Sequence, residues 1–137
     1  MNLNKTFLIG NLTRDPELKT LPSGGSVCNF SIATNRTWND KSSGQKKQDT
    51  EFHNIVVFGK MAESTAEYMK KGSSLLVEGR IQTRSWEGQD GVKKYKTEIV
   101  AESIQFGAKS SSSSQQSEQE PSEPEEEEEI KVEDIPF

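Results

Sequence analysis

The sequence predicts an all-β domain that is interrupted by one helix and followed by a disordered acidic tail. Two observations indicate the domain. Strand-like segments rich in β-branched and aromatic residues recur five times, and one segment between the third and fourth has apolar residues at helical spacing. A third observation indicates the tail, because the chain from Lys109 has no aliphatic or aromatic residue before Ile130. Such a segment cannot bury enough apolar surface to offset the entropy lost on ordering.

The first three strands are expected at residues 5–13, 26–35 and 51–58, where β-branched and aromatic residues are concentrated. Residues 21–25 lie between the first two strands, and their Pro-Ser-Gly-Gly sequence is typical of a turn. Residues 39–50 contain no apolar side chain and include a glycine. A long flexible hairpin loop is therefore expected between the second and third strands.

A helix is expected over residues 60–71, because apolar or small residues recur there every three or four positions. These residues are Met61, Ala62, Thr65, Ala66, Tyr68 and Met69. Lys70 and Lys71 would lie in the last turn, and Gly72 follows them as a C-terminal stop signal.

The last two strands are expected at residues 74–86 and 92–106, joined by a hairpin turn at residues 87–91 that ends in Asp-Gly. Five strands with one helix between the third and fourth are typical of a small Greek-key barrel of the OB type. The predicted fold is thus a five-stranded Greek-key OB-fold barrel with one helix between strands 3 and 4, plus the disordered acidic tail. A mixed α+β sandwich fits the same order of elements less well.

The charge of the chain divides at the same boundary. Residues 1–108 contain 15 Lys and Arg against 12 Asp and Glu, a net charge of +3, whereas residues 109–137 contain 2 against 10, a net charge of −8. This asymmetry suggests a polyanionic partner for the basic part. Three regions follow: an OB-fold domain at 1–107, a disordered Ser/Gln/Glu-rich linker at 108–129, and an acidic-hydrophobic tip at 130–137.

Several function classes are disfavoured by composition. Cys28 and His53 are the single cysteine and histidine of the chain, so neither a disulfide framework nor an ordinary zinc site is expected, and no cofactor motif is present. The histidine has no spaced partner for nucleophilic catalysis, and Gly59-Lys60 lacks the upstream glycine of a phosphate loop, so no enzyme is expected. With no signal-peptide or membrane-spanning run, a cytoplasmic location away from membranes is expected.

The aromatic residues are the best candidates for a binding site. Trp38 and Trp86 lie where strands enter polar loops, and Phe52 and Phe58 share one face of a strand. Basic residues lie close by in the sequence: Arg36, Lys41, Lys46, Lys47, Lys60, Arg84, Lys93, Lys94 and Lys96. Aromatic rings interleaved with cations suit single-stranded nucleic acid, whose bases stack while its phosphates meet positive charge. The alternative is that these rings belong to the core, to which we assign Phe7, Phe30, Tyr68 and Phe106.

The tip of the tail, Asp134-Ile135-Pro136-Phe137, is an apolar end on a highly charged segment that includes Glu125 to Glu129. A hydrophobic tip on such a segment has nothing of its own to pack against. It is therefore expected to bind a partner protein, with Phe137 in an apolar pocket and its carboxylate held by basic residues.

Five segments in order resemble the bacterial single-stranded DNA-binding protein (SSB) family, the homotetrameric OB-fold type. They are LIGNLTRDPEL, FSIATNRTWND, TEFHNIVVFGKMAE, YMKKGS and VEGRIQTRSW, and the terminal IPF completes the resemblance. It implies sequence-independent binding and protection of single-stranded DNA in replication, recombination and repair, with a nucleoid-associated location. Two departures stand out: Phe52 occupies a position that is tryptophan in better-known members, and Asn54 one that is arginine in some.

The resemblance also implies roles for individual residues. Base stacking falls to Trp38, Phe52, Phe58 and Trp86, and phosphate contacts fall to Lys41, Lys60, Lys71 and Arg84. His53 falls at a subunit interface of the homotetramer, and Asp134, Ile135, Pro136 and Phe137 dock genome-maintenance proteins. Two rival functions remain open: an RNA-binding or RNA-chaperone OB domain, and a protein-interaction adaptor whose aromatics are core.

Overall fold

The computed structural model describes residues 1–108, and all statements below concern this part of the chain. It contains six strands and one helix in the order β1 (Thr6–Leu12), β2 (Glu17–Thr20), β3 (Ser26–Asn39), β4 (Lys46–Phe58), α1 (Lys60–Tyr68), β5 (Ser74–Glu87) and β6 (Lys93–Phe106). The five predicted strands and the helix are all present. The short strand β2 was not predicted. The expected tip and all but the first residue of the expected linker lie outside the described residues.

The strands close into a barrel. Their order is β1-β5-β6-β4-β3-β2, and β1 also pairs with β3, the second strand from the other end, at Asn11↔Ala33 and Leu12↔Ile32. Strands β4 and β6 complete the circuit with a short parallel pairing at Ile55↔Ile99. The barrel therefore consists of β1, β3, β4, β5 and β6, with β2 as an added edge strand. Closure confirms the predicted OB-type barrel and excludes the mixed sandwich.

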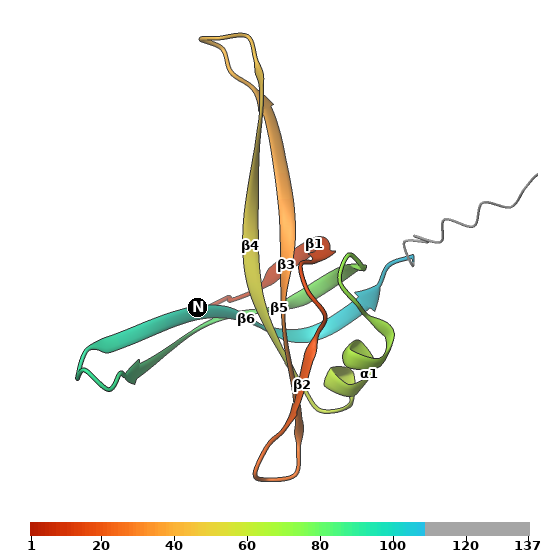
Figure 1. The fold of residues 1–137 in the computed structure, drawn as a ribbon, viewed down its shortest axis with the longest axis vertical. Coiled ribbons are helices and arrows are strands. Elements are labelled where there is room, and N and C mark those ends of the chain that lie inside the picture. Colours follow the sequence, from red (N-terminus) through yellow and green to blue (C-terminus); the bar gives the residue numbers. More distant parts are fainter. Residues whose placement is uncertain (109–137) are drawn as a thin grey trace, which may run out of the picture.

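Two hairpins extend far beyond the barrel as arms, one formed by β3 and β4 and the other by β5 and β6 (Figure 1). The β3–β4 ladder continues without interruption from Val27↔Phe58 to Asn39↔Lys46. The expected long loop at residues 39–50 is therefore wrong, because the connection between the strands spans only residues 40–45. Both faces of this arm are open to solvent, so polar side chains fit on either face. The backbone pairing of the ladder holds the two strands together there without an apolar face.

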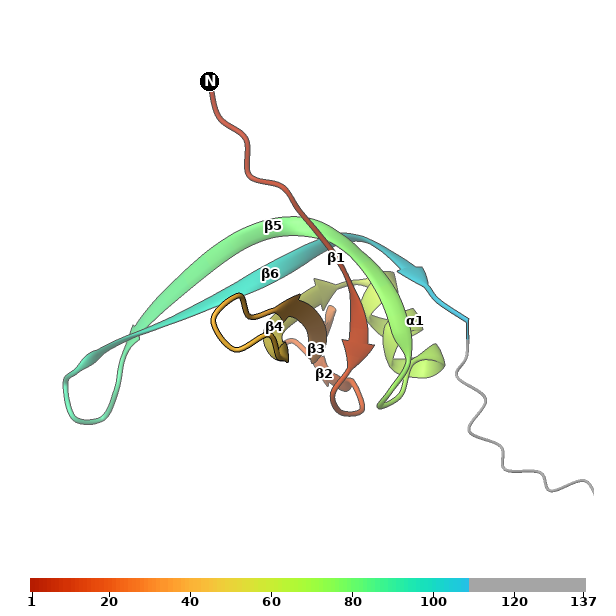
Figure 2. The ribbon, with the colours of Figure 1, turned by 90° about the horizontal axis from the view of Figure 1, so that it is seen from above.

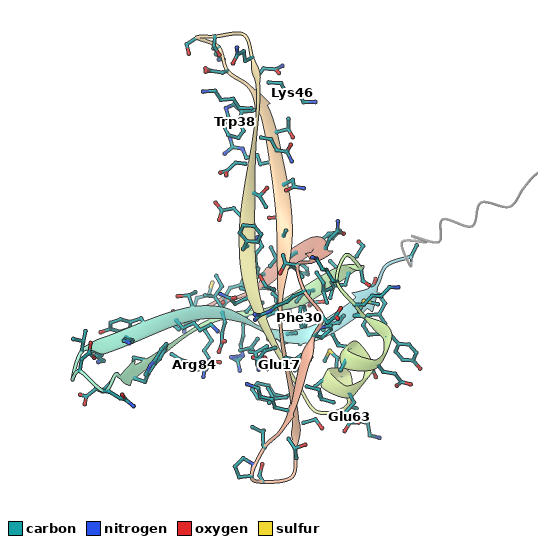
Figure 3. All side chains as sticks on the ribbon, viewed as in Figure 1. Glu17, Phe30, Trp38, Lys46, Glu63 and Arg84 are labelled. Carbon is teal, nitrogen blue, oxygen red and sulfur yellow. The ribbon has the colours of Figure 1, made fainter. Side chains whose placement is uncertain are left out.

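The core lies where the two hairpins cross, around Phe30, which is 2% exposed (Figure 3). It contains aliphatic residues from every barrel strand together with Ala62 of the helix. The expected core assignment is correct for Phe30 but wrong for Phe7, Tyr68 and Phe106, which are all exposed. Tyr68 and Phe106 instead pack against each other at the rim, with 6.1 Å between ring centroids. Cys28 is fully buried, and burial raises the pKa of its thiol.

Helix α1 lies beside one end of the barrel (Figure 2). It buries Ala62 and Thr65, and the Thr65 hydroxyl donates to the Met61 carbonyl at 2.7 Å. The expected extent to residue 71 is wrong, because the helix ends at Tyr68 and has no basic residue in its last turn. The following residues bond to the barrel instead: the Gly72 N–H donates to the Leu12 carbonyl of β1 at 2.8 Å.

Strands β5 and β6 carry an irregularity between Glu78 and Gly79, where the pairing shifts by one residue. Here the two backbones approach so closely that a Cβ on Gly79 would lie 2.2 Å from the Val100 carbonyl oxygen. Lys5 binds the outside of the same region, with its Nζ 2.7 Å from Glu78 and 2.8 Å from Glu102. These bonds raise the pKa of Lys5, chiefly through Glu102, and lower the pKa of Glu102.

Candidate functional site

A groove of about 440 Å³ runs over the barrel between strand β2, the base of the β3–β4 hairpin and the β5–β6 hairpin. Its floor is a small apolar cluster of Val27, Val56 and Val100, against which Leu21 packs. Each of the three valines comes from a different strand, and their side chains point away from the main core. The three valines are themselves nearly covered, at 5–8% exposed, so the open surface of the groove is formed mainly by the polar and charged side chains around them.

Four cations and two carboxylates line this groove: Arg14, Lys19, Arg84 and Lys96 against Glu17 and Glu98. Two residues predicted as binding residues lie here together, Phe58 and Arg84. Phe58 is 51% exposed at the end of β4, so its ring is available for stacking. The groove therefore has an excess of positive charge beside the exposed ring of Phe58.

Sequence reasoning missed Arg14, Lys19 and Glu98 as groove residues. The first two flank or belong to β2, which has four exposed residues and no apolar alternation that would have marked it as a strand. Glu98 lies within a predicted strand, but its position in the groove depends on the β5–β6 register. The signal in the sequence that could have drawn attention to Glu98 is its position as a single carboxylate that follows a basic stretch and precedes a run of aliphatic residues.

Arg84 is held by Glu98 across the β5–β6 ladder. The Arg84 Nε lies 2.6 Å from Glu98 Oε1, and Nη2 lies 3.4 Å from Oε2. The Glu98 side chain is 5% exposed, whereas that of Arg84 is 53% exposed. The guanidinium is therefore anchored on one side and open to solvent on the other.

The side of the β5–β6 arm that continues the groove is basic and aromatic. Directly paired residues of an antiparallel ladder share a face, and the register pairs Trp86 with Lys94 and Arg84 with Lys96. Because these positions alternate with the core-facing ones, Trp86 lies on the groove side of the arm. Trp86 is 46% exposed. The arm thus extends the groove outward with a second ring and further cations.

The β3–β4 arm carries Trp38 near its outer end, on the opposite side of the arm from Lys46 (Figure 3). Trp38 is 38% exposed, and the Arg36 guanidinium lies 5.3 Å from the ring centroid. Its ladder partner is Lys47, whose Nζ lies 2.9 Å from Asp40 Oδ2. Both tryptophans are therefore exposed, as the binding-site interpretation expects, and each has a lysine directly opposite.

Asp40 organises the loop at residues 40–45. Its carboxylate accepts hydrogen bonds from the backbone N–H and hydroxyl of Ser42 at 3.1 and 2.9 Å and from the Ser43 hydroxyl at 3.0 Å. Together with Lys47, these donors lower the pKa of Asp40 to about 2. The predicted contact residue Lys41 lies in this loop and is exposed.

Phe52 lies midway along β4 and is 65% exposed. It shares a strand face with Phe58, as predicted, because the two are six positions apart. It lies on the opposite face from Trp38, since the register pairs Phe52 with Ala33 and Trp38 with Lys47. The four predicted stacking rings are therefore all exposed, but they do not share a single face.

The remaining predicted residues lie apart from the groove. Lys60 is the exposed first residue of α1. Lys71 is exposed in the turn after the helix, where the Asp15 carboxylate accepts its backbone N–H at 2.8 Å. His53 is half-buried, with its Nε2 2.8 Å from the Thr34 hydroxyl.

This arrangement is suited to binding an extended polyanion with exposed flat rings. Aromatic side chains lie on both arms and at the groove, with lysines or arginines next to them. Among residues 1–108, no three His, Cys, Asp or Glu side chains gather where a metal ion would be held. The helix found in the same residues is neither long nor apolar enough to cross a membrane.

Comparisons with known proteins agree with this arrangement. The model of the Single-strand binding protein family matches residues 3–107. The structure of the Plasmodium falciparum SSB in complex with ssDNA aligns with a TM-score of 0.73 and 33% identity, over 79% of this chain and 97% of that one. A deletion mutant of the single-stranded DNA binding protein from Thermus aquaticus aligns with a TM-score of 0.69 and 33% identity, over 79% of this chain but only 52% of that one. This chain therefore belongs to the Single-strand binding protein family.

Proposed function

We propose that this protein binds and protects single-stranded DNA without regard to sequence. The observation that carries the proposal is the exposure of aromatic rings beside cations on both arms and at the groove of an OB-type barrel. Each base has a flat face, so stacking on Trp38, Phe58 or Trp86 tolerates any sequence. Lysines and arginines next to the rings meet the phosphates. The family membership and the ssDNA-bound relative support the same function.

Stacking supplies more of the binding energy than charge does in this proposal. The described domain has a small positive excess, whereas each stacked base contributes about 1–3 kcal/mol. Phe52 offers a smaller ring than tryptophan and is expected to contribute at the low end of that range. Binding is nevertheless expected to weaken with salt, because phosphate contacts release counterions from the DNA.

A fluorescence titration tests this function directly. The chain has 2 tryptophans, and both are exposed on the arms, so intrinsic fluorescence reports on both proposed stacking sites. Oligo-dT is expected to quench the emission, whereas duplex DNA of the same length is expected to bind much more weakly. A lack of quenching by oligo-dT would contradict the proposal and favour the adaptor alternative. Preferential displacement of oligo-dT by oligo-U would favour the RNA-binding alternative.

We further propose that the tip, residues 134–137, recruits proteins of DNA replication, recombination and repair to the coated strand. The proposal is supported by the acidic composition of residues 109–137 and the apolar Ile135 and Phe137 at their end. Burying one phenylalanine contributes roughly 1.5–3 kcal/mol, a modest affinity per tail. Deleting Phe137 is expected to abolish co-purification of partner proteins and to leave quenching by oligo-dT unchanged. Loss of both activities would argue against separate modules.

Assembly into a homotetramer in the cytoplasm, at the nucleoid, is proposed on the same family membership. An apolar face supports it: Phe7 and Ile9 of β1 are 64% and 70% exposed on the outer side of the barrel. Before Asn11, β1 pairs only with β5 within the described residues. His53 is a proposed subunit contact. Light scattering on the purified protein tests the stoichiometry, and a monomer would contradict it.

A further inference from the structure

We infer that Glu98 is a positioning residue for nucleic-acid binding, one that aims the Arg84 guanidinium into the groove. This inference rests on the proposed function and adds a residue that sequence reasoning did not assign to it. A carboxylate in the binding surface for a polyanion is unexpected, since it repels phosphate. Its burial and its contacts with Arg84 account for its presence.

The Glu98 carboxylate holds one edge of the Arg84 guanidinium. The Arg84 Nε–H and one Nη2–H point to the Glu98 oxygens, at 2.6 and 3.4 Å. A guanidinium has five N–H donors in a fixed planar fork. The other three donors, two on Nη1 and one on Nη2, are therefore directed away from Glu98. Arg84 lines the groove, where a phosphate would accept from two of these donors at once, one on each Nη.

The contact with Glu98 also lowers the conformational entropy that the Arg84 side chain would lose on binding DNA. A free arginine side chain at a surface samples many rotamers, and fixing it on binding reduces affinity. Glu98 removes most of that freedom in advance, and its own position is fixed because it is 5% exposed within the ladder, opposite Gln82. The pair is thus preorganised before DNA arrives.

Charge alone predicts the opposite behaviour. The groove has four cations and two carboxylates, so its net charge of +2 would rise to +3 without Glu98. If Glu98 only masked Arg84, its removal would strengthen binding and steepen the salt dependence. If Glu98 positions Arg84, its removal weakens binding and makes the salt dependence shallower, because one phosphate contact is lost.

Two substitutions separate these effects. Glu98→Ala removes both the charge and the acceptor, whereas Glu98→Gln removes the charge but keeps an oxygen that accepts the Arg84 Nε–H. Neither leaves a buried charge unpaired, because Arg84 itself is half-exposed and stays solvated. Thermal unfolding of each variant confirms that the domain remains folded at the temperature of the titration.

The assay is the tryptophan-quenching titration with a short oligo-dT over a range of salt concentrations. Glu98→Ala is expected to bind about 2- to 12-fold more weakly, the cost of ordering one long side chain. Its plot of log Kobs against log salt is expected to be shallower by about 0.7, the value for one phosphate contact on a single strand. Glu98→Gln is expected to bind at least as tightly as the wild type. In an Arg84→Ala background, Glu98→Ala is expected to weaken binding no further, because only the repulsion between Glu98 and phosphate is then removed.

Several results would overturn the positioning role: an Ala variant as tight as the wild type, a steeper salt slope, equal weakening by Ala and Gln, or an undiminished Ala effect without Arg84. The wild-type titration keeps this inference separate from the proposed function. If the wild type fails to bind oligo-dT, the proposed function fails. If the wild type binds and the variants behave as charge alone predicts, only the inference about Glu98 fails.

Discussion

Replacement of Trp86 by alanine is the sharpest test of stacking on the β5–β6 arm. Trp86 is 46% exposed, which leaves on the order of 115 Å² accessible on a tryptophan that offers about 250 Å². A base that covers half to all of this area contributes about 1.4–2.9 kcal/mol at about 25 cal/mol per Å². This range agrees with the about 1–3 kcal/mol measured for stacked bases in general. Trp86→Ala is therefore expected to weaken oligo-dT binding by about 10- to 100-fold.

The same arm provides a matched control in Tyr95. This ring is 65% exposed and lies 5.6 Å from the Lys93 amine, so it resembles Trp86 in exposure and in its cationic neighbour. The register pairs it with Ser85, however, which places it on the face opposite to Trp86. Tyr95→Ala is expected to change affinity by no more than about 2-fold, the usual range for a surface substitution.

Fluorescence anisotropy of a labelled oligo-dT is the appropriate assay, because it does not depend on the tryptophan that is removed. Circular dichroism confirms that both variants are folded. Equal weakening by the two substitutions would refute the reasoning, since it would show that the face of the arm does not decide the contact. An unchanged affinity of Trp86→Ala would refute stacking at this site.

Three further outcomes are expected from features of the barrel. Gly79→Ala should lower stability by about 1–3 kcal/mol, because the added Cβ overlaps a neighbouring backbone carbonyl, whereas Gly25→Ala, whose Cβ would meet only a side chain at 3.7 Å, should be nearly neutral in a thermal melt. The pKa of Glu102 is lowered in the folded state, so its ion pair with Lys5 stabilises the fold above pH 4.5, and this stabilisation is lost as the pH falls through the folded-state pKa of Glu102. Glu102→Gln should remove this part of the acid dependence of Tm, and a profile of Tm against pH that stays unchanged would contradict the ion pair. Cys28 is fully buried with a raised pKa, so a thiol reagent should label it only on unfolding, and rapid labelling of the native protein would count against the structure.

The barrel strands could be predicted because each has apolar residues that the core requires. The arms could not be, since their outer halves pack against nothing and carry no hydrophobic pattern. Residues 39 and 46–50 are polar and yet continue the ladder from the barrel outward. Strand β2 was missed for the same reason, because its four residues are all exposed.

The candidate site was predictable where it depends on alternation along one strand. The common face of Phe52 and Phe58 follows from their spacing, and the structure bears it out. The ion pair of Arg84 with Glu98 joins two strands diagonally, so it depends on a register that the sequence does not state. Likewise, the general rule that aromatic rings are buried failed for Tyr68 and Phe106, which stay exposed and pack against each other at the rim.

The parallel contact of β4 with β6 has a consequence for how the domain folds. Each arm is a hairpin of neighbouring strands, and its pairing can grow from a short turn without long-range search. The β4–β6 pairing, by contrast, involves just Ile55↔Ile99 and Val56↔Val100 and joins segments far apart in the chain. Bringing β4 and β6 together closes a long loop of chain, and two pairs of residues do not offset the entropy lost until both hairpins have formed. We therefore expect the hairpins to form early and the β4–β6 seam to limit the folding rate, so that Val56 or Val100 substitutions slow folding more than changes at the arm tips do.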